Sequence, residues 1–352
     1  MNRFWHETIS RLTPYTPGEQ PKNSPQLKLN TNENPFGPSP KVIEAIQQNL
    51  NDNLRLYPDP ESEKLKTAIA NYYNLPEPSV FVGNGSDEVL AFIFRAFFQD
   101  KKLLFPDITY SFYPVYCNLY GIDYALIPLE DNFEIKLEKY QPNEGAVIFP
   151  NPNAPTGIPL ELKIIKNFLG KNKNTIIVID EAYVDFGTQS AIGLIEEFDN
   201  LIVTQSFSKS RSLAGLRVGC AFSQPELIEA ICRVKNSFNS YPLDRLAQSA
   251  AIAAIEDEGY FKKTTQAVIG ARSFLEKELK NLHFNVLPSG ANFIFTSHIS
   301  YHAKHIFDQL KSHGILVRYF NQPAKIDNFL RITIGSMNQM QQLIKVLKQI
   351  VL

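Results

Sequence analysis

Short runs of consecutive apolar residues alternate with longer segments of helical periodicity between residues 41 and 240. The run Ile176–Ile179 is apolar at every position and consists of β-branched residues. Strands are apolar on both sides when helices cover both faces of a parallel sheet. The pattern therefore predicts an α/β fold in which a mostly parallel sheet is sandwiched by helices. Strands are expected over Val80–Val82, Leu103–Phe105, Tyr124–Pro128, Ala146–Phe149, Ile176–Ile179, Leu201–Gln205 and Val218–Phe222, and helices over Lys41–Leu50 and Glu61–Tyr73.

The pattern changes after Ser240. The segment from Asp244 to Lys280 carries Ala, Glu and Lys at helical spacing, which predicts a long helix. Further strands and helices follow it, as is typical of a smaller α+β domain. We therefore expect an extended arm over residues 1–40, rich in Pro and Asn, a large domain over 41–240 and a small domain over 241–352, linked by the long helix. The strands are expected over Phe284–Leu287, Phe293–Thr296, Leu316–Tyr319 and Phe329–Thr333, and the helices over Ala303–Ser312 and Gln339–Val351.

Composition limits the partners of the chain. Lys and Arg number 35 and Asp and Glu 36, so the formal net charge of −1 gives no reason to expect a nucleic acid or a membrane surface. No apolar run approaches the roughly 20 residues that cross a bilayer, and no targeting segment follows Met1, so we expect a cytoplasmic protein. The cysteines Cys117, Cys220 and Cys232 are too scattered for a disulfide framework and form no C-x-x-C pair, so no metal site is expected.

Two ionisable residues follow predicted strands at positions where a ligand would bind. Asp180 comes directly after Ile176–Ile179, and the carboxyl ends of parallel strands face the crevice in which open α/β sheets bind ligands. Asp180 alone could equally cap a following helix. Lys209 ends the segment Ser206–Lys209, whose hydroxyl groups could bind a phosphate together with Arg217. Lys209 alone would more often be a surface lysine, but a lysine whose charge is limited by its neighbours can act as a nucleophile.

Two turns rich in glycine, asparagine or proline accompany these strand ends. Residues Pro150–Gly157 follow the strand Ala146–Phe149, and their prolines and glycine are typical of a rigid turn. Residues Gly83–Glu88 follow Val80–Val82 and open a helix, whose first backbone N–H groups could bind a phosphate. Each turn is a weak indication by itself, because strand-to-helix turns of this composition are common.

The order of these motifs resembles that of the fold-type I, class I/II aminotransferases, which depend on pyridoxal 5'-phosphate. The shared features are the glycine turn, N-P-N-x-P-T-G, D-E-x-Y, S-x-S-K and G-L-R-x-G, and they extend over nearly the whole chain. The resemblance implies that Lys209 carries the cofactor and shuttles a proton, that Asp180 holds its pyridine nitrogen, and that Tyr110 stacks on its ring. It further implies hydrogen bonds to the ring phenolate from Asn153 and Tyr183, and to the cofactor phosphate from Ser86, Asp87, Ser206, Ser208 and Arg217.

Further strings are similar to those of histidinol-phosphate aminotransferases. This resemblance implies a homodimer in which Tyr57 reaches the cofactor phosphate of the partner subunit. It also implies that two arginines bind the phosphate ester of the substrate, because a dianion benefits from a second cation. The similar strings are Leu12–Tyr15, Asn30–Ser39, Tyr57–Asp59, Ala291–Phe293 and Leu330–Gly335, and the implied substrate-binding residues are Tyr15, Asn32, Arg318 and Arg331.

The expected reaction transfers the amino group of L-histidinol phosphate to 2-oxoglutarate, giving imidazole-acetol phosphate and glutamate in histidine biosynthesis. An aromatic or broad-specificity aminotransferase and a threonine-phosphate decarboxylase that uses the same cofactor stay open as alternatives. A transcription regulator on this fold would carry a helix-turn-helix domain, for which the arm is too short. One departure from the resemblance is Arg211, which stands where small apolar residues are more common. We expect Arg211 to be exposed, with an adjusting role in the site as the alternative.

Overall fold

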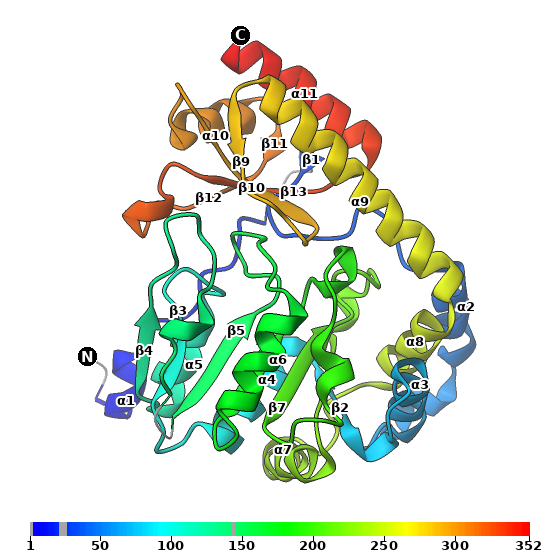
Figure 1. Cartoon of the computed structure of the whole chain (residues 1–352). Helices are drawn as coiled ribbons and strands as arrows, with labels where there is room; N and C mark the ends of the chain where they lie inside the picture. The colour runs from blue at the N-terminus through cyan, green and yellow to red at the C-terminus, as the bar shows by residue number, and fades with distance from the viewer. Residues whose placement is uncertain (1–2, 21–26, 143–144) are drawn as a thin grey trace.

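The computed structural model describes residues 3–20, 27–142 and 145–352. They form two lobes, each built on its own sheet, with the N-terminal segment running between the lobes (Figure 1). Helix α9 (Glu258–Asn281) extends along one side of the molecule from the larger lobe to the smaller one. The larger lobe has a hydrophobic core on each face of its sheet, and the smaller lobe has a core of its own.

The larger lobe contains a seven-stranded sheet in the order β2-β8-β7-β6-β5-β3-β4. Strand β8 runs antiparallel to β2 and β7, whereas the remaining neighbours in the sheet are parallel. The prediction of a mostly parallel sheet is therefore confirmed. The strands are β2 (Val80–Asn84), β3 (Leu103–Pro106), β4 (Tyr124–Ile127), β5 (Ala146–Pro150), β6 (Ile176–Asp180), β7 (Leu201–Ser206) and β8 (Val218–Phe222).

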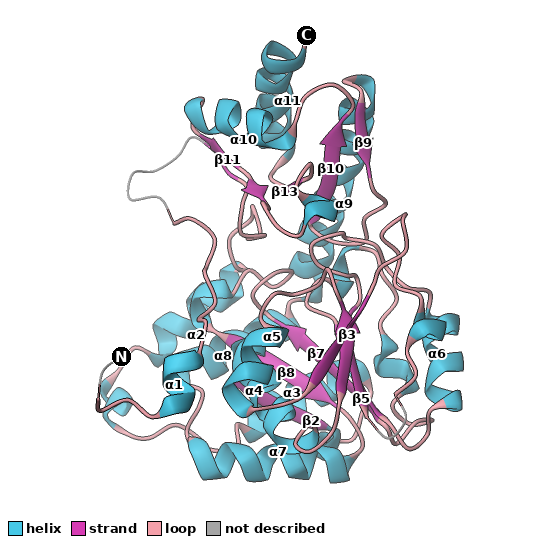
Figure 2. Ribbon diagram, turned by 90° about the vertical axis from the view of Figure 1, so that its left-hand side faces the viewer, coloured by secondary structure: helices cyan, strands magenta, loops and turns pink. Residues whose placement is uncertain are grey.

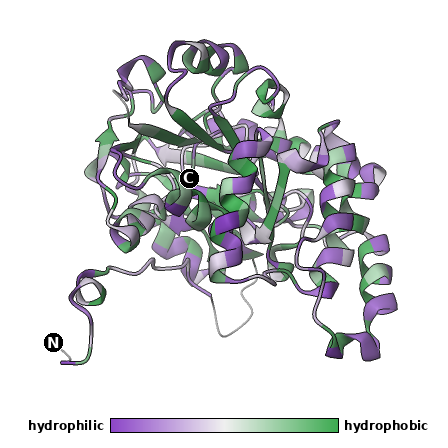
Figure 3. Cartoon of the chain, turned by 90° about the horizontal axis from the view of Figure 1, so that it is seen from below, coloured by the Kyte–Doolittle hydropathy of each residue, from purple (hydrophilic) through white to green (hydrophobic). Residues whose placement is uncertain are grey.

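Both faces of this sheet are buried, because side chains alternate between the faces along each strand. In β6, Ile177 and Ile179 join the core beneath one helical layer, whereas Val178 joins the core beneath the other. The central strands are hydrophobic along their length and the surrounding helices carry hydrophilic residues (Figure 3). One layer contains α2 (Pro40–Asn49), α3 (Glu63–Tyr73), α6 (Leu162–Lys171) and α8 (Arg245–Glu256), and the other contains α4 (Gly85–Phe97), α5 (Tyr113–Tyr120) and α7 (Pro225–Phe238).

The smaller lobe contains an antiparallel sheet in the order β12-β13-β10-β9. Its core lies between this sheet and three helices, which Figure 2 shows above the larger lobe. The strands are β9 (Phe284–Val286), β10 (Phe293–His298), β12 (Arg318–Tyr319) and β13 (Leu330–Thr333), and the helices are α9, α10 (Ala303–Ser312) and α11 (Met337–Val351).

The predicted long helix is wrong in one respect, because it is two helices. Helix α8 ends at Glu256 and α9 begins at Glu258, and Asp257 between them leaves the helical conformation with φ −90° and ψ 62°. The Asp257 carboxylate accepts a hydrogen bond from Ser39 Oγ, and such side-chain bonds compete with a continuous helix. Helix α8 packs into the core of the larger lobe, so of these two helices only α9 reaches the smaller lobe. The domain limits at residues 40 and 240 stay predictions.

The N-terminal arm is also less extended than expected. It contains helix α1 (Glu7–Arg11) and strand β1 (Leu27–Lys28), which pairs in parallel with β11 (Ile315–Leu316). Leu27 and Leu29 are buried in the core of the smaller lobe. Their apolar side chains gain from leaving water, so this part of the arm is a core element. The predicted strand Leu316–Tyr319 is accordingly divided into β11 and β12, which pair with different strands.

The carboxyl ends of the central strands bring polar residues together. Pro150 at the end of β5 lies in register with Asp180 at the end of β6, and Asp180 lies in register with Thr204 on β7. The fold therefore places the residues after these strands at one edge of the sheet, as predicted for a ligand crevice. No helix in the described ranges is long and apolar enough to cross a membrane.

Candidate active site

A cavity of about 600 Å³ lies at this edge, between the two lobes. The N-terminal segment, the loops after β3, β5, β6 and β7, and the smaller lobe all contribute to its wall. Twelve of the predicted site residues line it, although they are distant in sequence. These residues are Tyr15, Asn32, Ser86, Asp87, Tyr110, Asp180, Tyr183, Ser206, Ser208, Lys209, Arg318 and Arg331. Tyr57, Asn153 and Arg217 are not part of the cavity wall.

Lys209 projects into the cavity from the loop that follows β7. Its Nζ donates to Thr31 O at 3.3 Å and lies 5.8 Å from the centre of the Tyr183 ring. Its backbone carbonyl accepts a hydrogen bond from Asn34 Nδ2 at 2.9 Å. The backbone of Lys209 is therefore fixed, while its amine faces the space that a ligand would enter.

Asp180 is a buried carboxylate at the base of the cavity. Tyr113 OH donates to its Oδ2 at 3.0 Å, and Ala182 N donates to its Oδ1 at 3.3 Å. Burial raises the pKa of Asp180 to about 6, although these donors oppose the rise. A cation beside Asp180 would restore the charged carboxylate, so the site is suited to a protonated ring nitrogen.

The start of helix α4 forms a cradle beside the cavity. Gly85 has a φ of +79°, and a Cβ there would lie 2.4 Å from Arg217 Nη2. A Cβ at Gly219 would lie 2.3 Å from Ser86 N. Both positions require glycine, because the Arg217 guanidinium lies against Gly85 and the Ser86 backbone lies against Gly219. The positive end of the α4 dipole, the backbone N–H groups and Arg217 together favour an anion such as a phosphate.

Asp87 orients two other predicted residues in this cradle. Its Oδ2 accepts from Arg217 Nη2 at 3.1 Å, and its Oδ1 accepts from Tyr110 OH at 2.8 Å. Arg217 Nη1 also donates to Ser208 Oγ at 3.4 Å. Burial and the Asp87 carboxylate raise the pKa of Tyr110, so its phenol stays protonated and serves as a donor.

Asn153 lies behind the cavity wall. Its Nδ2 donates to Ile108 O at 3.0 Å and to Thr156 Oγ1 at 3.2 Å, so its amide connects the Pro150–Gly157 turn with the loop that carries Tyr110. Tyr183, the other residue expected at a ring phenolate, does line the cavity. Tyr183 OH accepts a hydrogen bond from Asn32 Nδ2 at 3.0 Å.

Two arginines meet at the opposite side of the cavity, on the smaller lobe. Arg318 in β12 and Arg331 in β13 lie directly across from each other in the sheet. Arg331 Nη2 donates to Asn30 O at 2.9 Å, whereas its buried Nε has no hydrogen-bond partner among the described residues. Burial and the neighbouring Arg318 both lower the pKa of Arg331. A pair of cations with an unsatisfied buried donor is suited to an anionic substrate group.

Tyr57 does not line the cavity of its own chain. Its side chain is 78% exposed and stacks on Tyr241 with ring centres 4.6 Å apart. Arg245 Nη2 donates to Tyr57 O at 3.1 Å and fixes the loop. Within one chain, Tyr57 therefore points its ring at Tyr241 and does not contribute to the cavity wall.

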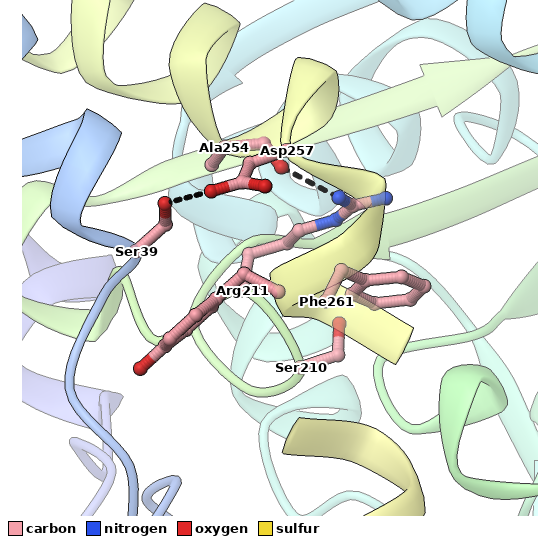
Figure 4. A pocket seen from close by; sticks show the side chains of 7 residues that line it. Ser39, Ser210, Arg211, Ala254, Asp257 and Phe261 are labelled. Carbon is pink, nitrogen blue, oxygen red and sulfur yellow. Dashed lines mark hydrogen bonds between the residues drawn. The ribbon is translucent and has the colours of Figure 1, made fainter. Parts of the chain in front are cut away.

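Arg211 is not exposed, and that expectation is wrong. Its side chain is only 8% exposed and lies among Phe261, Ala254 and Asp257 at the junction of α8 and α9 (Figure 4). Two aromatic rings beside the guanidinium and a hydrogen bond to a carbonyl oxygen make this burial possible.

The structure also adds residues that the sequence analysis did not identify. Tyr113 and Thr204 contact Asp180, and Thr31 and Asn34 contact Lys209. The one sequence feature that could have indicated Tyr113 is its place three residues after Tyr110, which was already a predicted site residue. The other contacts join segments far apart in sequence, so no local pattern could have indicated them.

Comparisons with known proteins agree with this geometry. The sequence profile of the family described as "Aminotransferase class I and II" matches residues 24–347. The chain is 56% identical to histidinol-phosphate aminotransferase 1 of Pseudomonas aeruginosa over 348 residues, which cover 99% of each protein. The structure of histidinol-phosphate aminotransferase from Sinorhizobium meliloti in complex with pyridoxal-5'-phosphate is 25% identical, has a TM-score of 0.89, and aligns over 100% of this chain and 98% of that chain.

L-threonine-O-3-phosphate decarboxylase from Porphyromonas gingivalis shares the fold. It is 22% identical, has a TM-score of 0.78, and aligns over 92% of this chain and 98% of that one.

The fold and the cavity together define a fold-type I enzyme in which a lysine, a carboxylate and an anion cradle lie around one cavity. Within that class, the chain belongs to the class I and II aminotransferase family.

The raised pKa of Asp180 predicts a pH dependence of stability for the unliganded protein. Its folded pKa of about 6 exceeds the unfolded value of roughly 4. The protonated form is therefore favoured by folding, and this contribution is present below pH ~4 and lost as the pH rises through ~6. Asp180→Asn should remove the dependence, so its free energy of unfolding should rise relative to wild type by on the order of 3 kcal/mol between pH 4 and 7.

Urea unfolding across this pH range would measure the difference between the two proteins. Asp52→Asn, at an exposed position, controls for the loss of one carboxylate. A difference that stays constant from pH 4 to 7 would contradict the assignment of the pH dependence to Asp180.

Proposed function

We propose that this protein is a pyridoxal-phosphate-dependent histidinol-phosphate aminotransferase, which uses 2-oxoglutarate as the amino acceptor. The observation that carries the proposal is the single cavity that joins Lys209, Asp180 and the cradle to the arginine pair. The 56% identity to the Pseudomonas aeruginosa enzyme over almost its whole length supports the same substrate. A transferase of this kind belongs to histidine biosynthesis.

The residues of the cavity fit pyridoxal 5'-phosphate. The cradle of Ser86, Arg217 and the α4 N-terminus suits its phosphate, and the glycines at 85 and 219 allow Arg217 and the Ser86 backbone to approach it closely. Asp180 suits the protonated ring nitrogen, and Lys209 would hold the aldehyde carbon covalently. Ser206, Ser208, Asp87, Tyr110 and Tyr183 complete the proposed set. Asn153 would donate to the phenolate oxygen only after its amide turns from Ile108 O.

In the proposed reaction, the residues of the cavity stabilise charge on the cofactor and move one proton. When bound, pyridoxal phosphate supplies an electron sink for the charge left at the donor Cα. Asp180 would keep its carboxylate against the ring nitrogen, where Tyr113 and Ala182 orient it. Lys209 Nζ would take the proton from the donor Cα and return it on the cofactor side. Thr31 O accepts from this Nζ, and Asn34 fixes the Lys209 backbone carbonyl.

The arginine pair would bind the far end of each substrate. The phosphate ester of histidinol phosphate carries up to two negative charges, and Arg331 Nε is free to donate to it. A carboxylate of 2-oxoglutarate would take the same place in the second half of the reaction. Tyr15 and Asn32, which line the cavity between the arginines and Lys209, would contact the body of the substrate.

The attachment role of Lys209 gives a direct test. Lys209→Ala should lose the visible absorbance of the bound cofactor and reduce turnover to background, because Lys209 is the one lysine among the described residues that line the cavity. Absorbance spectra and steady-state rates of the purified protein would measure both. Lys304→Ala, which removes an exposed lysine paired with Asp308, should leave both unchanged. An active Lys209→Ala protein would overturn the proposed chemistry.

The substrate is tested by mixing the cofactor-loaded protein separately with histidinol phosphate, phenylalanine, aspartate and threonine phosphate. Bleaching of the visible absorbance should be fastest with histidinol phosphate. Arg331→Gln should raise KM for that substrate by on the order of 10- to 100-fold, as expected for lost charged hydrogen bonds, and change the reaction of unphosphorylated histidinol little. Arg233→Gln on α7, which is exposed, serves as the control.

Two results of this screen would favour the alternatives. Fastest conversion with phenylalanine would favour an aromatic aminotransferase and leave the cofactor chemistry in place. Release of carbon dioxide from threonine phosphate would instead favour the decarboxylase. An equal loss of activity toward histidinol and histidinol phosphate in Arg331→Gln would separate Arg331 from the phosphate.

We further propose a homodimer in which Tyr57 completes the cradle of the partner subunit. Tyr57 is exposed and does not line its own cavity, and apolar side chains near it in sequence are exposed as well. Exposed apolar groups of this kind commonly mark interfaces. The exposed side chains are Leu50, Leu54, Leu56 and Tyr57.

Shared sites predict complementation between two defective variants. A heterodimer of Lys209→Ala and Tyr57→Ala should recover about half of the wild-type activity, because symmetry leaves one of its two sites intact. Two affinity tags would isolate the heterodimer, and assays at limiting cofactor would measure it. A heterodimer of Lys209→Ala and Arg217→Ala is the matched control and should stay inactive, since both residues belong to one subunit's site. Equal activities would contradict the shared site.

A further inference from the structure

Arg211 is a buried guanidinium that the proposed reaction does not use. Arg211 is 8% exposed and forms no ion pair within 4 Å among the described residues, although its charge opposes the rise in the pKa of the buried Asp185 carboxylate. Burial of such a charge is costly unless other groups stabilise it. The position is therefore held by specific contacts rather than by access to water.

Three elements supply those contacts. The guanidinium carbon lies 3.7 Å from the ring centre of Phe261 on α9 and 4.9 Å from that of Tyr72 on α3, so the cation lies against two aromatic rings. Arg211 Nη1 donates to Ala254 O in the last turn of α8 at 2.6 Å (Figure 4). A cation is favoured at a helix C-terminus by the free carbonyls and the dipole. Arg211 thus ties its loop to the junction of the two helices.

The same loop carries Lys209, two residues before Arg211. Between them, Ser210 Oγ donates to the buried Asp185 carboxylate, and Asn34 Nδ2 donates to Lys209 O at 2.9 Å. The backbone around Lys209 is therefore held by the N-terminal segment, by the loop after β6 and, through Arg211, by helices α3, α8 and α9. The Lys209 side chain is free to enter the cavity.

We propose that Arg211 is a positioning residue for Lys209, acting through the backbone of Ser210 rather than by contact with a ligand. This inference rests on the proposed function, because Lys209 matters there as the residue that holds the cofactor and moves the proton. Misplacement of a reacting group by about 1 Å can cost on the order of 100-fold in rate. A small shift of the loop would therefore reduce turnover without removing any group from the cavity.

A role in stability alone makes a different prediction. Replacing a buried charge by an apolar side chain of similar volume is often neutral or stabilising. Arg211→Met would then fold as well as wild type and turn over normally. Arginine differs from methionine and lysine in having a planar group that stacks on rings and donates in fixed directions. That geometry is what the positioning role requires.

The test compares Arg211→Met, Arg211→Lys and Phe261→Leu with wild type in the cofactor-loaded enzyme. We expect Arg211→Met to reduce kcat by about tenfold or more, with KM for histidinol phosphate within about twofold because the arginine pair is untouched. The circular dichroism of the visible cofactor band should change, since it reports the orientation of the ring relative to the protein. Phe261→Leu, which removes one stacking partner, should change both readouts in the same direction, and Arg211→Lys should recover part of each.

Arg233→Met, at an exposed position on α7, is the matched control. Normal kcat and an unchanged dichroism band in a folded Arg211→Met protein would overturn the positioning role. If Arg211→Met does not fold, Phe261→Leu and Arg211→Lys decide in the same way, and wild-type values in both would overturn it. A wild-type protein without cofactor absorbance or transamination would instead overturn the proposed function.

Discussion

The burial of the Asp180 carboxylate is the constraint on which the site depends. Parallel strands β5, β6 and β7 end together, and α5 covers them, so Asp180 is removed from water at the point where the chain leaves the sheet. Its raised pKa records the energetic cost of that burial. The cradle, Lys209 and the Tyr110 loop surround the carboxylate because they follow β2, β7 and β3, which all end at the same edge of the sheet as β6. A cationic ligand group at this position relieves the cost, which links binding to the stability of the fold.

The charged groups of the cavity come from both lobes. The larger lobe supplies the buried carboxylate and the helix end, whereas the smaller lobe supplies Arg318 and Arg331 in neighbouring strands. The N-terminal segment joins the halves, because Asn30 O accepts from Arg331 and Thr31 O accepts from Lys209. A ligand that is long enough to contact both halves is therefore selected by charge at each end and by length between them.

Much of this arrangement could be predicted from local sequence. The apolar runs predicted the strands of the larger sheet within one or two residues, and Asp180 and Lys209 followed from their place after such runs. The break at Asp257 could not be predicted, because it depends on Ser39 some 200 residues away in the chain. The burial of Arg211 was missed for the same reason, since Tyr72, Ala254 and Phe261 come from three distant helices.

Helix α9 has a mechanical consequence that follows from its length alone. Its 24 residues make a rigid rod of about 36 Å, anchored at one end beside Asp257 and embedded at the other in the core of the smaller lobe. A tilt of about 5° at the anchored end moves the far end by about 3 Å, as simple leverage on a rod of this length requires. The arginine pair travels with that far end, whereas the cradle stays with the larger sheet. Such a tilt would change the span between the two anion sites, and with it the length of substrate that the cavity can hold.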